Sequence, residues 1–272
     1  LRNHLQEFNK KLNFEDFNED GIADFINYMG KKGMKNSTIN KQLGFLRWYL
    51  RWCYEKDYHT NHTFEHFKPK LKSASKRVIF LTQEELEKVE NLKIPEKYTS
   101  LEAVRDVFLF CCYTGLRYSD AYNLTWEDIH NRKIEIVTVK TADRITIEIN
   151  SKSQAILDKY SDIHFPDKKV LPIISNQKMN KRLHTLCKLA GIDEPIKSTH
   201  YEGNKRIDEV KPKYELVGTH CGRRTFICTA LAKGIPPSVV MKWTGHSDYK
   251  AMKPYIDIAD EVKSSYMKQF DE

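Results

Sequence analysis

The stretch Tyr214–Gly234, YELVGTHCGRRTFICTALAKG, is the most informative part of this sequence. Its apolar flanks require part of a helix to be buried, yet His220, Arg223 and Arg224 stand near the start of that helix. Cations at a helix start oppose the helix dipole by about 0.3–1 kcal/mol each, so they need an anionic partner or an acidic neighbour. With Thr219 as the expected cap, His220 and Arg223 share one face of the first turn, where backbone N–H groups also attract an anion. Arg224 points away from that face and is expected to be structural or peripheral.

The overall composition sets broad limits. The 272 residues, 40% of them hydrophobic, suffice for one or two domains. A formal net charge of +8 favours acidic partners. The 6 cysteines form no C-x-x-C pair, and we expect buried or half-buried thiols in a reducing compartment. No run approaches the ~20 apolar residues of a membrane span and no signal peptide is visible. Since the chain begins at Leu1 rather than Met, we expect a fragment of a longer protein.

The first 72 residues have the apolar periodicity of helices. One helix is expected in NEDGIADFINYMGKKGM, with Asp20 as its cap and Gly30 as its end. A second is expected in KNSTINKQLGFLRWYLRWCYEKDYHTN, capped by Asn36 or Ser37. Their buried faces are expected to hold Ile22, Phe25, Ile26 and Met29 in the first helix, and Ile39, Leu43, Leu46, Tyr49 and Leu50 in the second.

Basic residues gather on the other face of the second helix and beyond it. Lys41, Arg47 and Arg51 lie opposite the apolar stripe. This surface is either a solvated helix face or one that grips the DNA backbone, and the pattern alone leaves both open. The segment KPKLKSASKRVIF predicts a linker between two domains, residues 1–74 and 75–272. The candidate DNA-binding residues are Lys41, Arg47, Arg51 and, in this linker, Lys76 and Arg77.

The second part is predicted to be mostly α with a small antiparallel β-sheet. A helix in TQEELEKVENL has Thr82 as its cap and Glu85 in the capping-box position. A buried helix, SLEAVRDVFLFCCYTG, runs from a cap at Ser100 to Gly115. The alternation in RKIEIVTVKTADRITIEIN predicts a hairpin that pairs 134–140 with 144–150. Helices near 151–160 and 177–190, an irregular stretch, the helix at 220–233 and short C-terminal helices complete the domain.

Two further segments carry candidate functional residues. Arg117 follows the buried helix in YTGLRYSDAYNLTWEDI, where Ser119 can cap the next helix. Taken alone, Arg117 is better explained as a surface arginine paired with Asp120. KWTGHSDYKAMKPYIDI supplies His246 and, nine positions later, Tyr255. Nothing intrinsic marks this tyrosine as a nucleophile, and the proline before it indicates an extended or turning backbone.

Several common site types are absent from the sequence. There is no H-E-x-x-H or Cys/His spacing for zinc and no G-x-x-x-x-G-K-[ST] loop for nucleotide phosphates. There is also no G-x-S-x-G elbow of a serine hydrolase. The sequence therefore predicts neither a metal nor another cofactor.

Five motifs in order resemble the tyrosine recombinase (phage-integrase) family over about residues 78–270. They are TGLRYSD, a hairpin carrying VKT, THCGRRTF, TGHSD and the tyrosine nine positions after its histidine. The preceding helical segment resembles the family's core-binding (SAM-like) domain, as in integrases of mobile elements rather than in the topoisomerase branch. The resemblance implies a helical core-binding domain followed by a catalytic domain.

The resemblance also implies residue roles. Tyr255 corresponds to the nucleophile, Lys140 to the hairpin lysine, and Asp120 to a supporting acidic position. The remaining catalytic positions are Arg117, His220, Arg223 and His246. Two arginines can present fixed cationic forks to the phosphate oxygens, so this chemistry needs neither a metal nor ATP.

The implied activity is cleavage and rejoining of double-stranded DNA through a 3′-phosphotyrosyl link, in integration or excision of a mobile element in a bacterial cytoplasm. The implied assembly is a homotetramer that exchanges C-terminal helices, with room for an accessory DNA-bending protein. The helix IADEVKSSYMKQF would make that exchange or pack on its own domain through Ile258, Val262, Tyr266, Met267 and Phe270. The alternatives are a DNA-binding module without turnover and a monomeric type IB-like topoisomerase.

Overall fold

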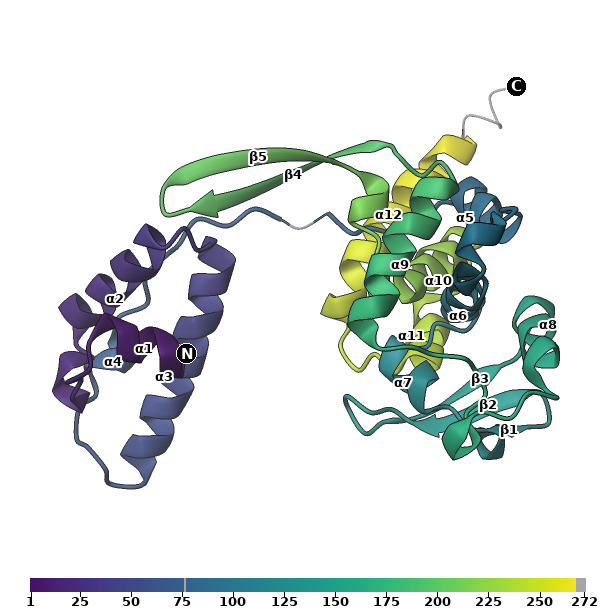
Figure 1. Cartoon of the computed structure of the whole chain (residues 1–272). Helices are drawn as coiled ribbons and strands as arrows, with labels where there is room; N and C mark the ends of the chain where they lie inside the picture. Colours follow the sequence, from purple (N-terminus) through teal and green to yellow (C-terminus); the bar gives the residue numbers. More distant parts are fainter. Residues whose placement is uncertain (76, 268–272) are drawn as a thin grey trace. The chain divides into compact units, whose positions relative to one another are not determined.

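The computed structural model describes residues 1–75 and 77–267, with only the backbone described for 259–267 (Figure 1). The chain forms two compact units. The first unit comprises Leu1–Arg77 and Lys197–Val210, and the second comprises Val78–Ile196 and the chain from Lys211 onward. The sequence predicted a single boundary between residues 74 and 75, and the return of residues 197–210 to the first unit was not predicted.

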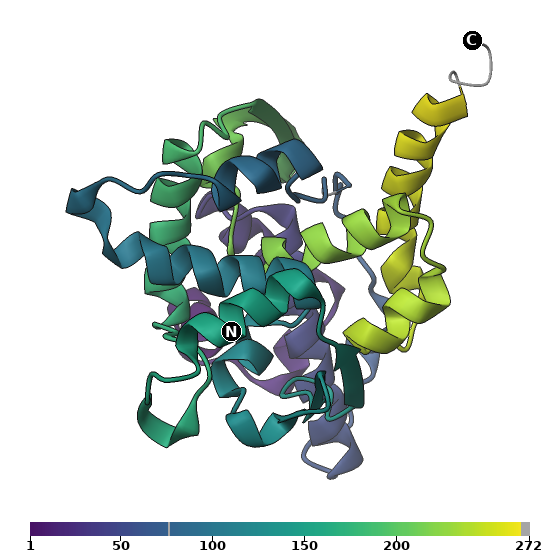
Figure 2. The ribbon, with the colours of Figure 1, turned by 90° about the vertical axis from the view of Figure 1, so that its right-hand side faces the viewer.

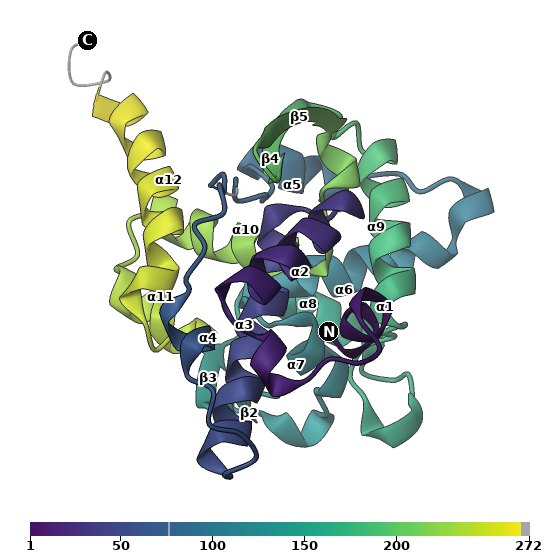
Figure 3. The same cartoon turned by 90° about the vertical axis from the view of Figure 1, so that its left-hand side faces the viewer.

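The first unit is a small helical bundle (Figure 3). Its helices are α1 (Arg2–Phe8), α2 (Glu19–Lys31), α3 (Asn36–Glu55) and α4 (Thr63–His66), with a 3-10 turn at Phe14–Asp16. The residues expected on the apolar faces of α2 and α3 are buried apart from Ile26, which is partly buried, and Tyr49, which is 45% exposed. Cys53 rather than Tyr49 continues the stripe, since it follows Leu46 and Leu50 at helical spacing. The core consists of Phe17, Ile22, Phe25, Met29, Ile39, Leu43, Leu46, Leu50 and Phe64.

The expected helix boundaries in this unit were wrong by a few residues. Asn18, not Asp20, caps α2, and its side chain accepts a hydrogen bond from the backbone N–H of Gly21. The helix continues past Gly30 to Lys31. Asn36 does not cap α3; it is 1% exposed, and its amide bonds to backbone groups distant in sequence.

The stretch after residue 190, expected to be irregular, contains a β-hairpin. Strand β4 (Pro195–Glu202) pairs with β5 (Lys205–Pro212) around a Gly203–Asn204 turn. Both strands are largely polar, so no apolar alternation announced them, although the Gly-Asn pair is a turn signal. At the tip, the Asn36 amide donates to the Gly203 carbonyl and accepts from its N–H, both at 2.8 Å.

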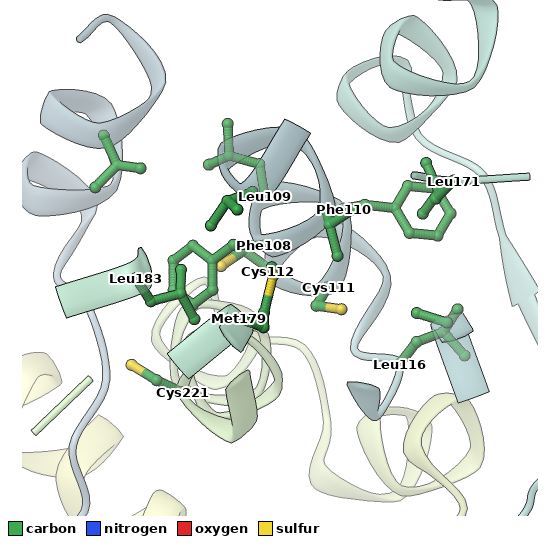
Figure 4. Packing of buried hydrophobic residues seen from close by; sticks show 14 of the residues in the cluster. Phe108, Leu109, Phe110, Cys111, Cys112, Leu116, Leu171, Met179, Leu183 and Cys221 are labelled. Atoms are coloured by element: carbon green, nitrogen blue, oxygen red, sulfur yellow. The ribbon is translucent and has the colours of Figure 1, made fainter. Parts of the chain in front are cut away.

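The second unit is organised around α6 (Ser100–Thr114), which is buried along most of its length (Figure 4). It packs against α8 (Ser151–Tyr160), α9 (Asn176–Leu189) and α10 (Thr219–Ala232), while α5 (Gln83–Glu90) has the predicted Thr82–Glu85 capping box. A Cβ added to Gly222 of α10 would lie 3.0 Å from Cys111 Cβ, so glycine lets the two helices approach closely. All six cysteines are free and buried, as predicted.

A three-stranded antiparallel sheet covers another part of this unit. Its order is β1 (Ile129–His130), β2 (Lys133–Val137) and β3 (Arg144–Glu148), with Val137 opposite Arg144. The hairpin was predicted, but the strands end earlier than expected. The N–H of Thr138 donates to the Asp143 carbonyl at 2.9 Å and closes a loop that contains Lys140. Lys140 is therefore an exposed loop residue rather than a strand residue.

The second unit also contains α7 (Tyr118–Asn123) and, towards the C-terminus, α11 (Pro237–Thr244) and α12 (Tyr249–Met267). Its 3-10 turns are Glu96–Tyr98, Trp126–Asp128, Pro166–Lys168 and Lys213–Glu215. The prediction of short helices at the end was wrong for α12, which also holds Pro254 inside it. Contacts with α10 through Met252, Tyr255 and Ile256 stabilise this helix despite the proline. Its C-terminal half extends beyond the other elements of its unit (Figures 2 and 3).

Of the apolar positions expected to dock this helix, Phe270 and the side chains of Val262, Tyr266 and Met267 lie outside the described residues. In the part of the chain that the structure describes, no helix has the length and apolar character needed to cross a membrane.

Candidate active site

The break between α6 and α7 positions Arg117. Gly115 ends α6 with φ at 73°, and an added Cβ would lie only 2.6 Å from a ring carbon of Phe226, so this turn requires glycine. Arg117 itself is the N-cap residue of α7, and Ser119 does not cap the helix as expected. The side chain of Arg117 is thus held between two rigid helices and remains partly accessible.

A buried carboxylate supports both this arginine and the lysine loop. Asp120 Oδ1 accepts a hydrogen bond from the Val139 N–H at 2.9 Å, directly beside Lys140. Asp120 Oδ2 is 3.7 Å from Arg117 Nη1, which is an ion pair but too long for a hydrogen bond. Both of these atoms are buried and have no hydrogen-bond partner among the described residues. Arg117 Nη1 therefore has hydrogen-bonding capacity that none of the described residues uses.

Arg223 on α10 is 1% exposed and is the largest fully buried side chain among the residues that the structure describes. Its Nη1 donates to the Gly115 carbonyl at 2.9 Å, and its Nη2 donates to the Thr244 carbonyl. Burial, followed by the charge of Arg117, lowers the pKa of Arg223 to about 10, while Asp120 and Tyr255 oppose that shift. The guanidinium thus stays cationic at neutral pH, and two carbonyls fix its orientation.

The two histidines are kept neutral. His220 lies in the first turn of α10, whose N-cap is Gly218 rather than the expected Thr219. Partial desolvation and then Arg224, Arg223, Arg117 and Lys140 lower the pKa of His220 to about 4, although the residue as a whole is exposed. Arg224, expected to be peripheral, is therefore close enough to act on His220.

His246 follows the αL residue that ends α11. Gly245 has φ at 59°, and the His246 N–H bonds to the Met241 carbonyl at 3.1 Å. The ring Nδ1 is 2.8 Å from Thr244 Oγ1. Burial, followed by Arg223, Arg117 and His220, lowers the pKa of His246 to about 4. An added Cβ at Gly245 would lie 3.1 Å from Ile145, so β3 packs closely against this turn.

The structure brings all six sequence-predicted catalytic candidates into one region of the second unit. Arg117, His220, Arg223 and His246 interact electrostatically with one another, Lys140 acts on His220, and half-buried Tyr255 acts on Arg223. Sequence reasoning missed Thr244 and the carbonyl of Gly115, which hold the catalytic candidates. A Thr-Gly pair ends each of α6 and α11. This repeated pair was the sequence signal that could have indicated Thr244 and Gly115.

The residues predicted to bind DNA are in different environments. Lys41 lies on the solvent face of α3, 5.8 Å from the centre of the Phe45 ring. Arg51 is exposed and pairs with Glu65, whereas Arg47 donates to a backbone carbonyl at 3.0 Å. Arg77 is exposed, and Lys76 lies outside the described residues. The same face of α3 exposes aromatic side chains, namely Phe45, Trp48, Tyr49 and Trp52.

No group of three or more His, Cys, Asp or Glu side chains suited to a metal ion occurs among residues 1–75 and 77–267. The fixed charges of the described site are cationic apart from that of Asp120. This excess of positive charge favours an anionic ligand.

Comparison with known proteins identifies relatives of both parts of the chain. Residues 79–261 match the model of the phage integrase family, and residues 1–71 match that of the phage integrase SAM-like domain. No curated protein matches the sequence. A lambda integrase dimer bound to a COC′ core site has a similar fold, with a TM-score of 0.72 and 18% identity over 94% of this chain and 86% of that chain.

Two further solved structures have the same fold. The Tn1549 transposon integrase in complex with circular intermediate DNA has a TM-score of 0.67 and 16% identity, over 93% of this chain and 85% of that chain. A lambda integrase tetramer bound to a Holliday junction has a TM-score of 0.69 and 17% identity, over 94% and 69%.

Proposed function

Because this chain belongs to the phage integrase family of tyrosine recombinases, we propose that it is a site-specific recombinase that integrates or excises a mobile element. Its two domains would bind double-stranded DNA, and the second would cleave and rejoin strands through a 3′-phosphotyrosyl intermediate. The observation that carries this proposal is the buried, carbonyl-anchored Arg223 beside Arg117, with the Tyr255 hydroxyl close enough to act on it.

The chemistry follows from these groups. Tyr255 Oη attacks the scissile phosphorus and loses its proton to neutral His220, while the bond to the 5′ oxygen breaks. Lys140 gives a proton to that leaving oxygen, so a 5′-hydroxyl forms. Arg117 and Arg223 hold the non-bridging oxygens, whose charge grows in the transition state. The bond energy stays in the phosphotyrosyl link, so rejoining needs neither ATP nor a metal.

The binding surface and assembly are also proposals. The solvent face of α3 would contact DNA, with Lys41 and Arg51 on the phosphates and the exposed aromatic side chains beside them. A homotetramer would form on DNA by exchange of C-terminal helices. The extension of α12 beyond its unit supports that exchange (Figure 2), and related integrases have been solved as a dimer and a tetramer on DNA.

The test is formation of a covalent adduct without metal. The full chain would be incubated in EDTA with a pool of nicked duplexes of randomised sequence, and adducts that resist denaturation would be captured and enriched. We expect adducts from the wild type and from Tyr249→Phe, an exposed tyrosine of the same helix, but none from Tyr255→Phe. Retained DNA without any adduct would instead indicate a binding module, and relaxation of supercoils without strand exchange would indicate a topoisomerase.

A further inference from the structure

The side chain of Thr244 lies between a helix carbonyl and a candidate catalytic ring. Thr244 is 0% exposed. Its Oγ1 is 2.6 Å from the Val240 carbonyl oxygen and 2.8 Å from His246 Nδ1. A hydroxyl has one hydrogen to donate, whereas a carbonyl oxygen can only accept.

These two short contacts determine the direction of both hydrogen bonds. If His246 Nδ1 carried a lone pair, both neighbours of Thr244 Oγ1, the Val240 carbonyl oxygen and Nδ1, would be acceptors. The single hydroxyl hydrogen could then bond to only one of them, and the other would face a lone pair of Oγ1. If Nδ1 carries a hydrogen, it donates to Oγ1, and Oγ1 donates to the Val240 carbonyl. Only the second arrangement satisfies both contacts, and a buried polar group left without a hydrogen bond destabilises the folded state.

We propose that Thr244 is a positioning residue that holds neutral His246 in its Nδ1–H tautomer, so that Nε2 carries the lone pair. The carbonyl of the same residue accepts from Arg223. Thr244 therefore orients both His246 and one of the two arginines that the proposed function, on which this inference rests, assigns to the phosphate. Neutral His246 is then a hydrogen-bond acceptor at Nε2. It donates to a phosphate oxygen only after it has gained a proton there.

The tautomer can be measured without any DNA. The full chain would be labelled with ¹⁵N-histidine, and the His246 signals assigned by their loss in His246→Gln. At neutral pH we expect the ¹⁵N shifts of a protonated Nδ1 and an unprotonated Nε2. Thr244→Val keeps the carbonyl and shape but removes the hydroxyl, and should lose this pattern, whereas Thr244→Ser should keep it. Thr114→Val is the matched control, because buried Thr114 also ends a helix and bonds to the carbonyl four residues earlier, at 2.7 Å.

The inference is overturned if wild-type His246 carries its proton on Nε2, or if Thr244→Val leaves the ¹⁵N pattern unchanged. Adduct formation on the enriched duplexes gives the functional measurement. Thr244→Val should slow it by about tenfold or more, and Thr244→Ser should restore it. Equal rates for wild type and Thr244→Val would refute the positioning role. If the wild-type protein formed no adduct through Tyr255, the proposed function would be refuted. The measured tautomer of His246 would still stand.

Discussion

The substitution Arg223→Lys tests whether the site depends on the several fixed N–H donors of a planar guanidinium or on positive charge alone. Arg223 donates to the carbonyls of Gly115 and Thr244 from two different nitrogens, and it is 1% exposed. A lysine keeps the positive charge, but its single ammonium cannot reproduce the planar geometry. At least one carbonyl loses its charge-assisted hydrogen bond, which lowers the free energy of unfolding by about 1.5–3 kcal/mol.

The effect on the reaction should be larger than the effect on DNA binding. Removal of one preorganised donor from a developing oxyanion costs about 2.7–4 kcal/mol, or a factor of about 10² to 10³ in rate. The affinity for DNA, spread over many contacts, should change by only a few-fold. The assay is the rate of adduct formation on an enriched nicked duplex, with affinity measured in parallel.

The control is Arg206→Lys, because Arg206 is an exposed hairpin residue paired with Asp208. It should leave the cleavage rate unchanged. Thermal unfolding of both variants separates a folding defect from a chemical one. A cleavage rate for Arg223→Lys within threefold of wild type, in a folded protein, would show that positive charge alone suffices at this position.

Three further predictions concern stability and local order. Gly115→Ala should lower the free energy of unfolding by more than about 2 kcal/mol in urea titrations, because its Cβ would lie 2.6 Å from an aromatic ring at a φ of 73°; a loss below 0.5 kcal/mol would contradict this. Asn36→Ala should accelerate trypsin cleavage within the β4–β5 hairpin, since the bonds to both backbone groups of Gly203 are lost; an unchanged digestion pattern would be the opposing result. The folded pKa values of His220 and His246, about 4, lie below the ordinary value, so the unfolded chain binds more protons between pH 6.5 and 4. Stability should therefore fall as pH drops through that window, by roughly 1–3 kcal/mol after allowance for solvent screening, and His220→Gln with His246→Gln should reduce the slope measured by urea titration.

Local signals predicted most of the fold. The capping box at Thr82 and Glu85 and the glycine that ends α6 fix helix limits through neighbouring residues, so the sequence predicts them well. The β2–β3 hairpin was predicted because its apolar alternation reflects one buried face. The β4–β5 hairpin was not, because its stability depends on contacts such as that of Asn36 with a residue 167 positions away. Pro254 was misread because packing on α10 outweighs a local preference.

The candidate site was predictable as a set of residues but not as a geometry. The order of the motifs indicated Arg117, His220 and Tyr255, yet nothing in sequence could give the backbone carbonyls that orient Arg223. Nor could it give the bond from the Val139 N–H to Asp120, which links the lysine loop to the arginine at the start of α7. These contacts join segments far apart in the chain, and periodicity reports only on near neighbours.

The most direct test of a metal-free phosphate site with a tyrosine nucleophile is identification of the atom that becomes bonded to DNA. Adducts formed in EDTA would be digested with nuclease and protease, and the remaining nucleotide located by mass spectrometry. We expect a 3′-phosphonucleotide on the peptide that contains Tyr255 and a free 5′-hydroxyl on the released strand. A nucleotide on any other residue, or attachment through a 5′-phosphate, would contradict it.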